Sequence, residues 1–97
     1  MKRATVHGPE HRELVTLLHD LRLQAGLSQA EVAAALDRPQ TYVSAVEVGR
    51  RGVDLVQVRE FCKVYGVKFP EFAALFEQRL AAKESNRRPP RRPRRTS

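Results

Sequence analysis

The sequence predicts an all-α protein with one compact domain of five short helices and a separate basic tail. Leucine, valine and alanine recur at the spacing of amphipathic helices. A capping-box pattern and well-placed glycines mark helix ends. Because 97 residues hold one core with little room for a second, we expect a flexible N-terminus at 1–8, a folded domain at 9–84 and a disordered or extended Arg/Pro-rich tail at 85–97.

The first two helices are predicted at residues 9–25 and 29–36. Pro9 suits a first helical turn, and Gly26 ends that helix. The apolar stripe between them consists of Leu14, Leu18, Leu21 and Ala25. The run Ser28–Glu31 has the capping-box pattern, in which a hydroxyl and a carboxylate each satisfy a free backbone N–H. A short, alanine-rich helix therefore begins at about residue 29.

A third helix is predicted at residues 39–48. Asp37 tolerates the left-handed backbone that a tight break before this helix requires. Pro39 fits its first turn, and Val43 and Val46 face inward at helical spacing.

The fourth and fifth helices follow similar signals. Asp54 is a good N-cap for the fourth helix, and Gly66 closes it. Pro70 starts the fifth helix, which is expected to fade near Glu84. Their apolar stripes consist of Leu55, Val58, Phe61, Cys62 and Tyr65, and of Phe72, Leu75, Phe76 and Leu80.

The net charge of +7 belongs almost entirely to the tail. Residues 87–97 hold six arginines and no acidic residue, whereas residues 1–86 hold 12 basic and 11 acidic residues. The tail is either a solubilising segment or a contact to DNA, RNA or an acidic protein surface. The arginines of the nucleic-acid alternative are Arg87, Arg88, Arg91, Arg92, Arg94 and Arg95.

The second and third predicted helices meet the requirements of a helix-turn-helix. They are short and joined by a tight turn, so that the second can insert into a major groove. Ala30 and Ala33 permit a close crossing against Val43 and Val46. The outward positions are then Gln40, Thr41, Ser44 and Ala45, with Tyr42 beside them.

Two segments resemble the lambda Cro/repressor-type, or XRE-like, helix-turn-helix family: GLSQAEVA at 26–33 and VSAVEVGR at 43–50. The resemblance extends from about Leu21 to Leu80 and implies a lambda-repressor-like domain that binds duplex DNA. Asp37 stands where the family's turn often has glycine, and Pro39 where a Ser or Thr cap is common. Both remain compatible with a turn.

The resemblance also implies residue roles. The base-reading positions are Gln40, Thr41, Ser44 and Ala45, and the DNA-backbone contacts are Gln29, Arg38, Tyr42, Arg50 and Arg51. A Gln amide can make two hydrogen bonds to adenine, whereas Ala45 offers only a methyl group. Ser44 also suits a phosphate contact, which fixes register without carrying sequence information.

Two further roles concern architecture. Arg22 and Glu47 match a charge pair that ties the first helix to the end of the third, as a structural brace. Because the family commonly dimerises through its C-terminal helix, we expect a homodimer. The predicted interface consists of Phe72, Leu75, Phe76 and Leu80.

Other classes of function lack support in the sequence. His7 and His11 are four residues apart, but Gly8 and Pro9 interrupt a helix there, so no metal site is expected. Cys62 is expected to be a core residue. We predict neither an enzyme nor a cofactor. No apolar run approaches a membrane span and no secretory signal is visible, so a cytoplasmic protein, nucleoid-associated when bound, is expected.

The sequence thus predicts a sequence-specific transcriptional repressor of bacterial or phage origin, which binds double-stranded DNA as a dimer. One alternative is an antitoxin that represses its own operon and grips a toxin through its fifth helix or tail. Another is an adaptor that uses this fold to bind protein or RNA.

Overall fold

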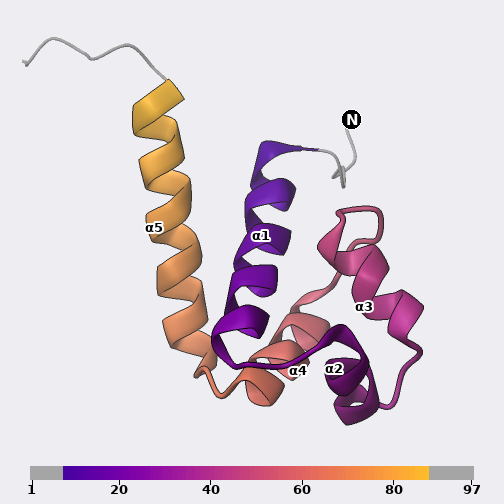
Figure 1. Cartoon of the computed structure of the whole chain (residues 1–97). Helices are drawn as coiled ribbons and strands as arrows, with labels where there is room; N and C mark the ends of the chain where they lie inside the picture. The colour runs from indigo at the N-terminus through magenta and orange to yellow at the C-terminus, as the bar shows by residue number, and fades with distance from the viewer. Residues whose placement is uncertain (1–7, 88–97) are drawn as a thin grey trace, which may run out of the picture.

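The computed structural model describes residues 8–87, and in this part of the chain every regular element is a helix. The helices are α1 (Pro9–Gln24), α2 (Gln29–Leu36), α3 (Gln40–Glu47), α4 (Leu55–Tyr65) and α5 (Phe69–Arg87) (Figure 1). The prediction of an all-α domain of five helices is therefore confirmed.

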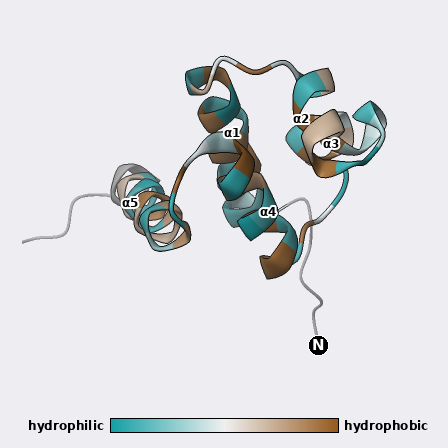
Figure 2. Cartoon of the chain, turned by 90° about the horizontal axis from the view of Figure 1, so that it is seen from below, coloured by the Kyte–Doolittle hydropathy of each residue, from teal (hydrophilic) through white to brown (hydrophobic). Residues whose placement is uncertain are grey.

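α1 and α4 form the centre of the domain, and the other three helices pack against them. The α2–α3 pair lies on one side of these helices and α5 lies on the other (Figure 2). α5 runs antiparallel beside α1 (Figure 1), and three ion pairs join the two helices. They are Arg79–Glu13 at 3.5 Å, Arg79–Asp20 at 3.0 Å and Lys83–Glu13 at 3.5 Å. This arrangement leaves α3 at the edge of the molecule farthest from α5.

Two helices begin with complete capping boxes. Ser28 Oγ accepts a hydrogen bond from Glu31 N at 3.0 Å, and Glu31 Oε1 accepts one from Ser28 N at 2.8 Å. At the start of α4, Asp54 Oδ1 accepts from Gln57 N at 2.8 Å, and Gln57 Oε1 accepts from Asp54 N at 2.9 Å. Each N-cap side chain contributes about 1 kcal/mol. The boxes therefore fix where α2 and α4 begin.

Asp37 makes the turn between α2 and α3. Its backbone is left-handed, with φ 59° and ψ 46°, a conformation that Asp adopts more readily than most residues. The Asp37 N–H donates to Ala34 O at 3.1 Å, and the Arg38 N–H donates to Ala33 O at 2.9 Å. The chain therefore leaves α2 and enters α3 within three residues, which holds the two helices at a fixed angle.

The core joins side chains from all five helices, including Phe72 of α5. Its largest fully buried members are Phe61, Leu17, Leu18, Val32, Val43, Val46 and Cys62. Burial of each larger apolar side chain contributes about 1.5–3 kcal/mol. Because Val43 and Val46 are wholly buried, the inward face of α3 is fixed by the core.

The element boundaries differ from the predictions mainly at α5. It ends at Arg87, three residues past the expected end at Glu84, because no helix breaker intervenes before Pro89. The helix thus includes the first residues assigned to the tail. The remaining tail arginines lie outside the described residues, as do residues 1–7. Those arginines are Arg88, Arg91, Arg92, Arg94 and Arg95.

Candidate nucleic-acid interface

The outward face of α3 carries the predicted base-reading residues. Gln40 and Thr41, in the first turn, are exposed, whereas Ser44 and Ala45 are half-buried. On the opposite side, Val43 and Val46 are inaccessible to solvent. α3 therefore presents a short polar surface at its N-terminal end, and its second turn is less accessible.

Tyr42 lies in the core, and the expectation that it contacts the DNA backbone directly is wrong. Only 7% of the residue is exposed, and its hydroxyl is buried without a hydrogen-bond partner among the described residues. The reason is helical geometry, since Tyr42 and Val46 are one turn apart and share the inward face. Burial raises the pKa of the Tyr42 hydroxyl, although Arg38 and Arg51 act in the opposite direction.

Three arginines flank α3. Arg38 precedes the helix, and its Nη2 lies 3.6 Å from Glu60 Oε1 of α4. Arg50 and Arg51 follow the helix and are exposed. Their backbone N–H groups both donate to Ala45 O, at 3.0 and 3.2 Å. This shared acceptor folds the loop back onto the last turn of α3.

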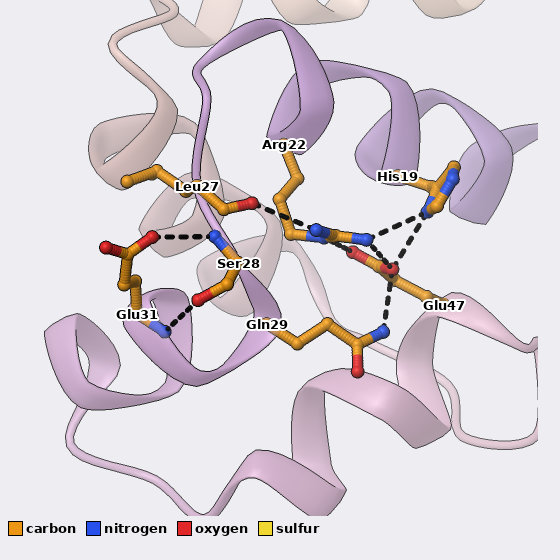
Figure 3. Close-up of polar contacts among 7 residues, drawn as sticks. All are labelled: His19, Arg22, Leu27, Ser28, Gln29, Glu31 and Glu47. Atoms are coloured by element: carbon orange, nitrogen blue, oxygen red, sulfur yellow. Dashed lines mark hydrogen bonds and ion pairs between the residues drawn. The ribbon is translucent and has the colours of Figure 1, made fainter.

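Glu47, the last residue of α3, is held by the polar side chains of three other residues (Figure 3). Arg22 of α1 donates from Nε to Glu47 Oε2 at 2.7 Å and from Nη2 to Glu47 Oε1 at 3.0 Å. His19 Nδ1 lies 2.9 Å from the same Oε1, and Gln29 Nε2 donates to it at 3.0 Å. Arg22 Nη1 also donates to Leu27 O at 2.9 Å. The network therefore joins α1, the start of α2 and the end of α3.

The Glu47 carboxylate is charged and almost completely buried. Its side chain is 4% exposed and that of Arg22 is 11% exposed. Burial alone raises the pKa of Glu47, but the hydrogen bonds with Arg22, His19 and Gln29 outweigh it and lower the pKa below its ordinary value. The hydrogen bond with Glu47 in turn raises the pKa of Arg22. Removal of one charge would thus leave the other buried and unpaired.

The structure brings Arg22 and Glu47 together as the predicted pair, and it gives Gln29 a partner in α3 that the sequence did not identify. The Gln29 amide nitrogen is directed at Glu47 (Figure 3), so Gln29 links α2 to α3. His19 was also missed. Its signal was available, because His19 precedes Arg22 by three residues and so shares its face of α1.

The predicted dimer stripe on α5 packs mainly within the chain. Phe72 is 3% exposed and belongs to the core, so its assignment to a dimer interface is wrong. Leu75 and Phe76 are partly buried against the same core, and Leu80 is half-buried. The physical reason is that the small domain needs this stripe to cover α1 and α4. The exposed large apolar side chains of the described chain lie elsewhere, at Leu23, Val48, Leu55 and Val56.

Other kinds of site find little support in the described residues. Cys62 is buried, and burial raises the pKa of its thiol to about 11, which disfavours the reactive thiolate. No group of three or more His, Cys, Asp or Glu residues in residues 8–87 could hold a metal ion. Over the same range, no helix combines the length and apolar character needed to span a bilayer.

Comparisons with known proteins agree with this geometry. The sequence model of the family described as "Helix-turn-helix domain" matches residues 13–75. No curated protein matches the chain. Among solved structures, an XRE-family like protein from Pseudomonas syringae pv. tomato str. DC3000 is 32% identical, with a TM-score of 0.70. The match covers 76% of this chain and 90% of that one.

Two more distant structures share the fold. The restriction-modification controller protein C.Esp1396I, solved as a tetramer in complex with its natural 35 base-pair operator, is 17% identical, with a TM-score of 0.72. That match covers 77% of this chain and 99% of the controller. The clp gene regulator ClgR from Corynebacterium glutamicum is 23% identical, with a TM-score of 0.63, over 82% of this chain and 89% of ClgR.

Proposed function

Since the chain belongs to the XRE-like helix-turn-helix family, as its sequence motifs predict, we propose that it is a transcriptional repressor that binds double-stranded DNA sequence-specifically. The observation that carries the proposal is the two-sided character of α3. Val43 and Val46 anchor one side in the core, while Gln40 and Thr41 are exposed on the other. A helix held in this way can enter a major groove without losing its position in the domain.

Gln40 and Thr41 supply the proposed base readout. The amide of Gln40 can bond to the N6 and N7 atoms of one adenine, and the Thr41 hydroxyl can serve as donor or acceptor. Half-buried Ser44 and Ala45 contribute a hydroxyl and a methyl group at the rim of this surface. Base contacts are therefore concentrated in the first turn of α3.

Affinity comes mainly from phosphate contacts. Arg38, Arg50 and Arg51 lie at the two ends of α3 in the sequence, and they can contact the DNA backbone beside the inserted helix. Such contacts set the register of the protein on the duplex and make affinity depend on salt. The cationic tail adds to this sequence-independent attraction.

We further propose that the repressor binds as a homodimer with two-fold symmetry. C.Esp1396I shares the fold and was solved as a tetramer on its operator, which supports assembly on DNA. A two-fold dimer requires a palindromic operator with half-sites about one helical turn apart. The mass of the protein–DNA complex, measured by sedimentation, tests the number of copies bound.

The proposed function is tested by selection from random duplexes, followed by titration of the enriched duplex. The expected result is a palindromic motif that is bound at least about a thousandfold more tightly than unrelated duplex at physiological salt. Fluorescence anisotropy at several salt concentrations measures both affinities. Failure to enrich any motif, with equal affinity for all duplexes, would contradict sequence-specific regulation.

A further inference from the structure

We propose that Tyr42 is a positioning residue whose ring holds the guanidinium groups of Arg38 and Arg51 beside α3 for contact with the DNA backbone. The proposal rests on the proposed function and deepens it, because it states how the side chains of two phosphate-binding arginines are already positioned in the DNA-free protein. It also replaces the direct backbone contact that the sequence predicted for Tyr42.

Two arginines from opposite ends of α3 meet at one ring. Arg38 precedes the helix and Arg51 follows it, so eight helical residues separate them, about 12 Å of helix. The Arg38 guanidinium carbon nevertheless lies 4.6 Å from the centre of the Tyr42 ring, and that of Arg51 lies 5.0 Å from it. The two guanidinium carbons are therefore no farther apart than the sum of these two distances.

The ring itself is rigidly placed. It stacks on Phe61 with a centroid separation of 5.9 Å and an interplanar angle of 9°, and Phe61 is 1% exposed. The Tyr42 hydroxyl makes no hydrogen bond to any described residue. Because the ring and not the hydroxyl makes the observed contacts, a platform of this kind needs an aromatic side chain but does not need a phenol.

The electrostatics favour cations at this ring. Its negative face attracts guanidinium groups, and planar Arg stacks there better than Lys. Glu60 lies 3.6 Å from Arg38 and offsets the repulsion between the two arginines. Free arginine side chains lose rotamer freedom when they bind a phosphate. Arg38 and Arg51 have already given up part of that freedom, so binding costs less.

A double-mutant cycle on the selected duplex tests the role of the ring. Tyr42→Leu is expected to weaken binding about three- to tenfold, whereas Tyr42→Phe binds like the wild type. In an Arg38→Ala/Arg51→Ala background, the same Leu substitution is expected to change affinity less than about twofold. Equal losses in both backgrounds would show that Tyr42 acts only through the core, and would overturn the proposal.

A further double variant leaves the core unchanged. Arg38→Lys/Arg51→Lys keeps both charges and lies near the surface, so folding is preserved even if Tyr42→Leu unfolds the domain. If the arginines are held by stacking, this variant binds about threefold or more weakly at the same ionic strength. An affinity equal to that of the wild type would overturn the proposal.

A measurement without DNA separates this proposal from the proposed function. In NMR spectra of the free protein, ring currents should shift the side-chain resonances of Arg38 and Arg51 in the wild type and in Tyr42→Phe. Unshifted resonances in folded wild-type protein would overturn the platform alone. Shifted resonances in a protein that binds no duplex would instead refute the proposed function, and with it the role in DNA binding.

Discussion

The residues in and around α3 fall into two groups. Some fix the helix in the domain, and others are exposed on its surface. Glu47 is the clearest example of the first group, since its buried carboxylate accepts hydrogen bonds from α1 and α2 at the point where α3 ends. Gln40 and Thr41 belong to the second group, because they are exposed and lie near the start of the helix. The two sets lie at opposite ends of one eight-residue helix, so their effects on stability and on DNA recognition can be separated by substitution.

Replacement of Gln40 or Thr41 by Ala should reduce the preference for the selected duplex over unrelated duplex. The expected loss is about 1–3 kcal/mol of discrimination at Gln40, which can bond an adenine twice, and less at Thr41, with nonspecific affinity nearly unchanged. Gln78→Ala is the matched control, because Gln78 is an exposed glutamine on α5. Competition titrations measure the preference. Equal weakening on all duplexes would contradict the assignment of these residues to base readout.

The Arg22–Glu47 pair should show strong non-additivity. Arg22→Met leaves a carboxylate that is 4% exposed without its bidentate partner, and is expected to lower the free energy of unfolding by about 3–5 kcal/mol. The double variant Arg22→Met/Glu47→Leu should be more stable than the single one, because no unpaired charge remains buried. Urea unfolding of both proteins checks this. A double variant less stable than the single one would refute it.

The lowered pKa of Glu47 also makes a contribution to stability that depends on pH. A carboxyl group whose pKa is lower in the folded than in the unfolded state stabilises the fold above its unfolded-state pKa, and loses this contribution as pH falls through the folded value. The difference in unfolding free energy between wild type and Glu47→Gln should therefore be largest at neutral pH and shrink below the ordinary value of 4.5.

Urea titrations from neutral pH down to about pH 3 measure this difference across the ordinary titration range of glutamate. Glu84→Gln is the control, since Glu84 is an exposed residue of α5. Its effect on stability should remain small throughout. A gap between wild type and Glu47→Gln that is constant with pH would contradict the prediction.

At the scale of whole helices, the sequence predicts most of what is local. Capping boxes, turns and glycines act within a few residues, so the start of α2 at Gln29 and the turn at Asp37 follow directly from the chain. The partner of Gln29 could not be predicted in this way, because the contact to Glu47 spans 18 residues. Likewise, an apolar stripe on α5 does not reveal whether its own domain or a second copy covers it.

The packing of α5 gives a test at this scale. Phe72→Ala should lower the free energy of unfolding by about 3–5 kcal/mol, because it opens a cavity in the core. The loss should not depend on protein concentration, whereas loss of an interface residue would. Leu80→Ala, at a half-buried position, should cost less. A Phe72→Ala protein of unchanged stability that no longer self-associates would contradict the core assignment.

For the whole molecule, the excess positive charge and the proposed base-reading residues lie in different parts of the sequence. Residues 1–86 are nearly neutral, and the basic excess follows them. Deletion of residues 88–97 should flatten the dependence of log affinity on log salt by about 0.9 for each DNA phosphate that the tail neutralises. The control replaces the five arginines of this segment by serine at unchanged length and should flatten it equally. An unchanged slope in both proteins would show that the tail does not touch DNA.

The antiparallel α5 also determines where the tail starts. It carries the chain about 28 Å along its axis to Arg87, on the side of α1 opposite α3 (Figures 1 and 2). α5 thus places the start of the tail on the side of the domain away from α3. A duplex bound at α3 would therefore be approached by the tail from another side of the domain, and contacts of the tail with its phosphates would add affinity without reading bases.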